Sequence, residues 1–322
     1  MLGSINRVLE RMMPIITPVS VIIGVLLTDE LKSWSYLVPW IFAVMTFIGS
    51  LGSNFKSLKD VFTHPMRLIT VLLILHIIVP LWALLLGHIT FSGDIHTITG
   101  IVLAAVIPTG ITSFIWVSVY KGNAPLALTI ILVDTFLSPF IVPYSVSLLA
   151  GEKVVIDTFG MMQGLLGMVV IPSLLGMTLH EVTKGKVKQK LGVPLAPFSK
   201  IGLAAVVMIN SSVVAPYLKN FDVKLLTIAA LSLTVSASGY MISVGVGKLL
   251  KWGRGDVTTL MFTGGMRNIS AGAVIAVAYF EPAVAVPVVI GMLFQQVLAS
   301  IFGHLLHKSY EKPLIQKQVK GA

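Results

Sequence analysis

The chain has 322 residues, of which 56% are hydrophobic and only 11% are charged, and its mean hydropathy is +0.94. A soluble domain carries about a quarter charged residues, so this composition excludes an ordinary soluble protein and indicates a helical membrane protein. The absence of cysteine excludes disulfides, thiolate metal sites and a cysteine nucleophile.

Ten apolar segments long enough to cross a bilayer as helices follow one another along the chain. The predicted spans cover residues 8–27, 35–53, 67–87, 97–120, 124–149, 157–179, 199–218, 225–250, 256–280 and 283–307. The first span follows two arginines, but it lacks a small-residue cleavage site. It is therefore interpreted as a membrane helix and not as a signal peptide.

Lysine and arginine residues support this count, because they alternate between the two sides of the predicted membrane. With the N-terminus inside, eighteen of the 23 fall on the inner side and four fall on the outer side, while Arg267 lies within a span. This bias predicts that both termini are cytoplasmic. It also accounts for the net charge of +10 without a nucleic-acid partner.

The polar stretches divide the chain. Residues 183–198 are predicted to form a cytoplasmic loop between helices 1–6, in residues 1–182, and helices 7–10, in residues 199–309; residues 310–322 form a polar tail. The sequence contains no G-x-x-x-x-G-K-[ST] loop, which argues against ATP-driven transport by this chain alone. It also shows no paired-carboxylate, Ser-His-Asp or H-E-x-x-H arrangement, so we do not expect an enzyme.

Two spans are interrupted by glycine, proline and hydroxyl residues at matching places, "IPTGITS" at 107–113 and "TGGMRNIS" at 263–270. Five helices in each half invert the second half, and a matched pair of interrupted helices marks the binding site of many secondary transporters. Half-helix N-termini at such breaks suit an anion. The predicted substrate-binding residues are Thr109, Gly110, Thr112, Ser113, Gly264, Gly265, Arg267 and Asn268.

Two formal charges fall well inside the predicted spans, Asp134 and Arg267. Each is costly in the bilayer, so we expect them to face the interior and either to pair or to meet the charge of a ligand. His76 is more typical of a hydrogen-bonded packing residue, with proton coupling as its functional alternative. Gln295 and Gln296 are predicted to bond to neighbouring helices or to backbone.

At the interrupted spans the chain resembles the bile acid:sodium symporter family. The resemblance rests on P-x-G-x-x-S at 108–113, "KGNAPLALTIILVDTFLSPF" at 121–140 and "GGMRN" at 264–268, and it covers nearly the whole sequence. It implies an all-α polytopic membrane protein with ten transmembrane helices in two inverted five-helix repeats. Helices 3–5 and 8–10 would form a core domain in which the discontinuous helices 4 and 9 cross, and helices 1, 2, 6 and 7 would form a panel domain.

The resemblance also implies sodium coupling, but most of the family's ligand positions carry other residues here. Those positions hold Leu75, Ala127, Ile131, Thr263 and Arg267, and Phe114 replaces an asparagine. Ser113, Met266 (through its backbone) and Asn268 are the residual sodium-site positions. Arg267 is predicted to stand in for one cation, with Asp134 as a counter-charge or proton site.

The sequence thus predicts a secondary active transporter of a small or amphipathic organic anion, such as a bile-acid-like or pantoate-like carboxylate, working by alternating access. We expect it in a bacterial inner or plasma membrane, with the lipid bilayer and the anion as partners, no obligate protein partner and no cofactor except Na⁺ or H⁺ as coupling ion. A proton-coupled or uncoupled carrier of the same fold is the first alternative. A non-transporting membrane sensor or structural protein is the alternative from another class, and an intramembrane enzyme comes last.

Overall fold

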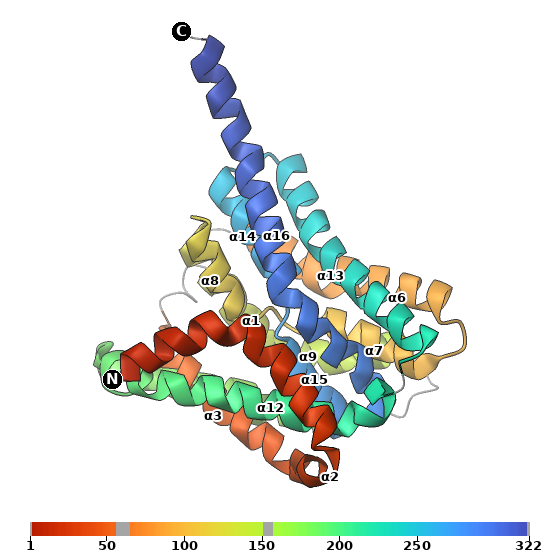
Figure 1. The fold of residues 1–322 in the computed structure, drawn as a ribbon. Coiled ribbons are helices and arrows are strands. Elements are labelled where there is room, and N and C mark those ends of the chain that lie inside the picture. The colour runs from red at the N-terminus through yellow and green to blue at the C-terminus, as the bar shows by residue number, and fades with distance from the viewer. Residues whose placement is uncertain (1, 56–64, 151–156, 220, 321–322) are drawn as a thin grey trace.

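The computed structural model describes residues 2–55, 65–150, 157–219 and 221–320, and within these ranges it contains helices and no β-strand. The helices are, in chain order, α1 (Leu2–Leu26), α2 (Thr28–Leu31), η1 (Lys32–Leu37), α3 (Val38–Ser50), α5 (Pro65–Leu73), η3 (Ile74–Ile78), α6 (Val79–Thr90), α7 (Ile95–Val106), α8 (Thr112–Val119), α9 (Ala124–Ala150), α10 (Thr158–Leu165), η4 (Leu166–Val170), α11 (Ile171–Val182), η5 (Lys188–Gly192), α12 (Val193–Lys219), α13 (Val223–Leu249), α14 (Arg254–Gly265), α15 (Ile269–Tyr279) and α16 (Pro282–Lys320). Figure 1 shows their arrangement.

Eight of the described helical segments are long and apolar enough to cross a membrane, and they correspond to eight of the ten predicted spans. The first predicted span corresponds to the shorter apolar helix Ile15–Leu26 within α1, and the fourth begins with the shorter apolar helix Ile95–Val106 and continues, after an interruption, in α8. The fourth is short because its helix stops before Pro108, a residue that lacks the N–H needed to continue it. The protein is therefore an all-helical, polytopic membrane protein.

The predicted loop at 183–198 is mostly helical. After the turn at 183–185 the chain enters η5 and then α12, so that Lys188–Lys219 forms one long apolar helical segment. Lysine is a good helix former despite its charge, so a lysine-rich segment does not by itself mark a loop. The predicted polar tail is likewise helical, because α16 continues to Lys320 and its last turns extend beyond the other helices (Figure 1).

Prolines explain the three π-helical turns of the described chain. The turns η3, η4 and η5 end two residues before Pro80, Pro172 and Pro194, respectively. Each proline cannot donate the usual hydrogen bond to the carbonyl four residues earlier, and a wider turn accommodates the freed carbonyl. Pro139, inside α9, is accommodated differently, since the Ser138 hydroxyl donates to Thr135 O at 2.7 Å in place of the missing N–H.

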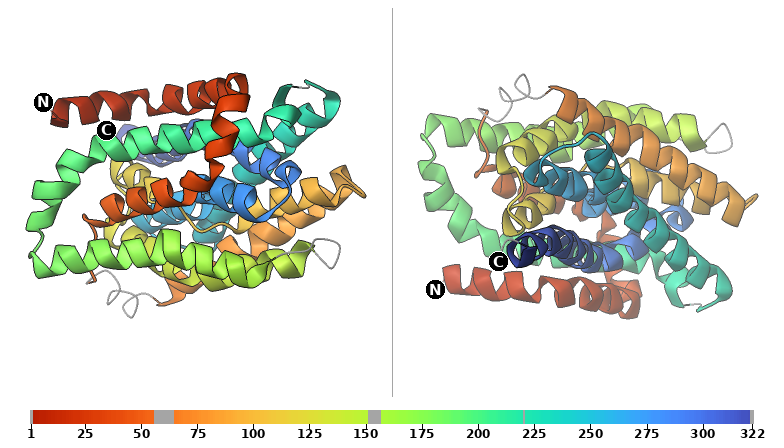
Figure 2. Two further views of the ribbon diagram at one scale, coloured as in Figure 1. Left: turned by 90° about the horizontal axis from the view of Figure 1, so that it is seen from below. Right: turned by 90° about the horizontal axis from the view of Figure 1, so that it is seen from above.

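The helices pack in two groups. In one group α1 lies along α12, and α3 packs against both α12 and α11, as Figure 2 shows for α1 and α12 along one side of the molecule. In the other group α16 packs against α7, α13 and α15, while α13 packs against α14, and α7 against α6 and α9. The second group contains the interrupted helices.

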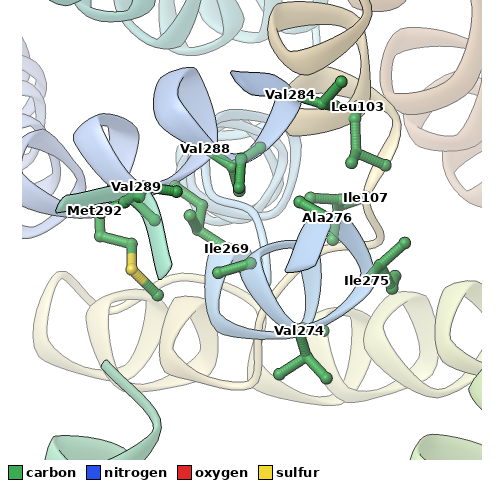
Figure 3. Packing of buried hydrophobic residues seen from close by; sticks show 14 of the residues in the cluster. Leu103, Ile107, Ile269, Val274, Ile275, Ala276, Val284, Val288, Val289 and Met292 are labelled. Atoms are coloured by element: carbon green, nitrogen blue, oxygen red, sulfur yellow. The ribbon is translucent and has the colours of Figure 1, made fainter. Parts of the chain in front are cut away.

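A hydrophobic cluster holds the interrupted helices together. Leu103 of α7 and Ile107 at its end face Ile269 and Ala276 of α15 and Val288 of α16 (Figure 3). These side chains are nearly or fully buried. Burying a large aliphatic side chain contributes about 1.5–3 kcal/mol, so this cluster holds α7, which precedes the first interruption, and α15, which follows the second, against α16.

Candidate functional site

Both predicted interruptions are present. Break 1, residues 107–111, separates α7 from α8, and break 2, residues 266–268, separates α14 from α15. They touch each other at a place we call the junction, where Asn268 N donates to Pro108 O at 2.8 Å. A β-carbon added to Gly110 would lie only 3.1 Å from Arg267 O, so the two backbones approach closely. The junction thus brings together segments 160 residues apart in the chain, the separation of Pro108 and Asn268.

Each break leaves helical hydrogen bonds unmade, and one of them at each break concerns a donor and a carbonyl that find new partners at the junction. In a continuous helix the N–H of Thr109 would bond to Ala105 O, and the N–H of Asn268 would bond to Gly264 O. Here Thr109 N donates to Asp134 Oδ2 at 2.6 Å, and Asn268 N donates to Pro108 O. Two carbonyl oxygens at the C-terminal ends of α7 and α14 are therefore left for other donors.

The Arg267 guanidinium satisfies both carbonyls. Its Nε donates to Ala105 O at 2.9 Å, and its Nη1 donates to Gly264 O at 2.8 Å and to Met266 O at 3.3 Å. Because helix C-termini carry partial negative charge, one buried cation stabilises the ends of two half-helices. The residue is only 6% exposed, and its backbone N–H is held by Gln295 Oε1 at 3.1 Å.

Asp134 of α9 is fully buried, and each of its two carboxylate oxygens has a partner. Its Oδ2 accepts from Thr109 N, and its Oδ1 lies 2.6 Å from Nε2 of His76, whose side chain is 7% exposed. The hydrogen bond missing at break 1 would join Thr109 N to Ala105 O. Asp134 accepts from that N–H, and Arg267 donates to that carbonyl. Among the described residues Asp134 pairs with His76 and forms no ion pair with Arg267, so of the two predicted alternatives the direct Asp134–Arg267 pair is not the one present.

His76 is hydrogen-bonded in the interior, as the sequence predicted, and the structure supplies the partner that the sequence could not name: its Nε2 lies 2.6 Å from Asp134 Oδ1. It lies in the π turn η3, caused by Pro80, so its position depends on a local backbone feature. The predictions for the two glutamines are confirmed: Gln295 accepts from Arg267 N, and Gln296 Oε1 accepts from Trp116 Nε1 at 3.0 Å.

A pocket lies beside the junction. It is lined by residues of α6, α7, α13 and α16 and by Gly265, Arg267 and Ile269 at break 2. Its polar lining consists of Ser232, Ser236 and Tyr240 of α13, with Arg267 and Gln295. In the described part of the chain, Arg267 Nη2 and the Tyr240 hydroxyl are buried without a hydrogen-bond partner. A donor left so costs about 1–3 kcal/mol, which makes both atoms candidates to bind a ligand.

The pocket includes only two of the predicted substrate-binding residues, Gly265 and Arg267. The other six build the junction or lie next to it and do not line the pocket; they are Thr109, Gly110, Thr112, Ser113, Gly264 and Asn268. Asn268, for example, caps α15 by accepting from Ala271 N at 3.3 Å. The side-chain oxygens of Thr109 and Ser113 are buried without a partner among the described residues.

Sequence reasoning missed the contribution of α13. Ser232, Ser236 and Gly239 follow the spacing that places residues on one helix face, and Tyr240 continues that face. This polar and small stripe in an otherwise apolar span was the available signal. It could not be assigned to the site without knowing that α13 packs against α14 and α16.

The comparisons with known proteins identify the class and then the family. Residues 38–221 match the Sodium Bile acid symporter family, and the chain belongs to this family of membrane transporters, which are not enzymes. Among its relatives, "Uncharacterized protein YbaS" of Bacillus subtilis (strain 168) is 52% identical over 95% of this chain and 100% of its own length. "Uncharacterized sodium-dependent transporter YocS" of the same organism is 25% identical over 87% of this chain and 88% of its own.

A plant relative lies at a similar distance. "Probable sodium/metabolite cotransporter BASS1, chloroplastic" of Oryza sativa subsp. japonica is 26% identical over 81% of this chain and 63% of its own length. The family membership and these relatives agree with a multi-pass membrane transporter. The predicted family membership is thus confirmed.

Proposed function

We propose that the protein is a secondary transporter of a small or amphipathic organic anion in a bacterial plasma membrane. The observation that carries this proposal is the pocket beside the junction, where Arg267 Nη2 and the Tyr240 hydroxyl are two buried donors without a protein partner. A carboxylate has two oxygens that accept such donors, and charge-assisted hydrogen bonds are roughly twice as strong as neutral ones. Ser232 and Ser236 offer further hydroxyls on the same wall.

The same geometry argues against sodium beside Arg267. Sodium requires oxygen ligands, but Gly264 O and Met266 O already accept from the guanidinium, and Asn268 already caps α15. Leu75, Ala127 and Ile131, at three further ligand positions of relatives, have apolar side chains. We infer that Arg267 occupies the place of one coupling cation permanently, so that transport does not need sodium there.

Alternating access in this proposal uses the two packing groups. The group of α1, α3, α11 and α12 acts as the panel, and the group containing the junction acts as the core that moves against it. The junction itself is held by buried hydrogen bonds and by the cluster around α15, so it moves as a unit. This assignment follows the family's expected core and panel, with both chain ends on the cytoplasmic side.

Counterflow in liposomes tests the function directly. Purified protein should exchange a small carboxylate such as pantoate, or a larger one such as taurocholate, across the vesicle membrane, and should not exchange amines. Tyr240→Phe removes one hydrogen bond, worth about 0.5–1.5 kcal/mol, and should weaken the apparent affinity about two- to tenfold. Tyr217→Phe, at an exposed position of α12, is the matched control and should have no effect. Exchange of amines, or an affinity insensitive to Tyr240→Phe, would contradict the proposal.

A further inference from the structure

The buried His76–Asp134 pair has the geometry of a proton-binding site. When Asp134 is ionised its carboxylate only accepts hydrogen bonds, and in the contact of 2.6 Å between Nε2 and Oδ1 the proton then lies on the histidine nitrogen. In neutral imidazole the other nitrogen then has a free lone pair. That nitrogen, Nδ1, is buried and has no hydrogen-bond partner among the described residues. A proton can therefore be added at His76 Nδ1 without breaking an existing contact.

The charges of the interior show what such a proton would do. Arg267 is positive, Asp134 is negative and His76 is neutral when one nitrogen is protonated, so the three groups together carry no net charge. A bound monovalent anion would make this buried set negative, and an uncompensated buried charge costs several kcal/mol. A proton on His76 Nδ1 restores neutrality, so binding of the anion and binding of the proton favour each other.

Other titratable groups near the pair do not change this balance. In the interior the helices packed against it bring Tyr240 in addition to Arg267. The remaining groups on these helices lie toward helix ends or at exposed positions; they are Arg67, His88, His96, Tyr144, Lys224, Lys248, Arg254 and Asp256, with Asp94 and Asp157 as the N-caps of α7 and α10. Arg67 and Asp256 pair with each other at 2.9 Å, and Arg254 contacts His307 at 2.7 Å.

Asp134 connects this site to break 1. One oxygen holds His76 and the other holds the N–H of Thr109 in break 1. When His76 becomes an imidazolium, it draws the carboxylate charge toward Oδ1 and weakens the bond of Oδ2 to break 1. The π turn that positions His76 is also a backbone irregularity of the kind found at functional sites.

We propose that His76, held by Asp134, is the proton-binding site that drives transport, with one proton carried for each monovalent organic anion. The proposal rests on the proposed function, since it names the coupling ion of the same transporter. Two relatives have names that describe sodium-dependent or sodium/metabolite transport. In this chain the proposal gives the role of sodium to a proton on His76.

A pH gradient across liposomes tests the coupling. For a carboxylate that the wild-type protein exchanges, an electroneutral one-to-one symport should give about tenfold accumulation for a pH difference of about one unit, without sodium. His76→Gln keeps an N–H for Asp134 but cannot bind a proton. It should lose this accumulation, with exchange at equal pH reduced severalfold at most. His88→Gln, at an exposed position of α6, is the matched control and should accumulate as the wild type does.

A second measurement does not depend on any substrate. In detergent solution a pH titration of the wild-type protein should show the uptake of about one proton that His76→Gln lacks. Tryptophan fluorescence on heating checks that the variant remains folded. An equal proton count for the two proteins, accumulation driven by sodium in place of the pH gradient, or accumulation retained by His76→Gln overturns the proposal. Exchange that responds to neither gradient also overturns it but leaves the proposed function standing. Absence of exchange for every carboxylate overturns the proposed function and with it the coupling, whereas the proton count still decides whether His76 binds a proton.

Discussion

The two helix breaks solve the same problem with different residues. Break 1 has no charged residue of its own, and its free N–H at Thr109 depends on Asp134 from α9. Break 2 contains Arg267, which donates to carbonyls at the C-terminal ends of α7 and α14, and Asn268, which caps α15. Break 2 therefore carries its own charged donor, although its backbone N–H groups bond to Gln295 and Pro108, whereas the charged group that holds break 1 comes from another helix. A change at Asp134 reaches break 1 alone, while a change at Arg267 reaches both.

The largest effect is expected for Arg267→Gln. The variant removes the buried cation and leaves Ala105 O or Gly264 O without a donor, so both breaks should suffer. Leaving a buried carbonyl without its donor costs about 1–3 kcal/mol, and transport should be lost. Thermal unfolding in detergent and counterflow measure the two effects. Arg267→Lys keeps the charge without the fork and should be intermediate; a fully stable, active Arg267→Gln would show that break 2 does not depend on its arginine.

The next largest effect concerns the partner of Asp134. A double-mutant cycle between Asp134→Asn and His76→Gln should give a coupling energy of about 1–2 kcal/mol in unfolding stability, because the two side chains are in contact. The cycle between Asp134→Asn and Arg267→Lys should give a smaller value, since these residues meet opposite ends of a broken hydrogen bond without touching. Reversal of this order would show that the direct Asp134–Arg267 pair dominates after all.

Packing around the two breaks should differ as well. A β-carbon at Gly265 would lie 2.5 Å from ring carbons of Tyr240, whereas at Gly110 the nearest atom is 3.1 Å away. Gly265→Ala should therefore cost about 1–3 kcal/mol of unfolding stability and disturb the pocket, and Gly110→Ala should cost less. Gly245→Ala, where nothing lies within 4 Å of the added carbon, is the helical control and should not destabilise. Equal losses at Gly110 and Gly265 would contradict the packing argument.

The smallest effect is expected for Thr109→Val. Break 1 uses the backbone N–H of this residue, and its hydroxyl has no partner in the described structure. Replacing a buried hydroxyl that has no partner with a methyl group of the same shape should not lower unfolding stability and should leave counterflow close to that of the wild type. A strong loss of exchange with normal stability would instead return Thr109 to the substrate site, as the sequence alone predicted.

The general architecture was predictable because composition and helix-breaking residues determine it. Apolar length predicted the spans, and Pro108, Gly110, Gly264 and Gly265 predicted the breaks. The pocket was not predictable, since its lining comes from helices that are far apart in sequence and only packing brings them together. Charge counting correctly placed Asp134 and Arg267 in the interior, but it could not choose their partners, because hydrogen bonds to backbone compete with pairing between side chains.

The π turn at Ile74–Ile78 makes the direction of the His76 side chain depend on the number of residues in front of Pro80. A π turn holds more residues per turn than an α-helix, and each residue of an α-helix turns the chain by about 100°. Removing one residue there would let the segment close into ordinary helix and rotate His76 relative to α6. The histidine would remain in the sequence yet face away from Asp134, so a count of residues, and not a substitution, would decide whether the membrane interior holds a titratable pair.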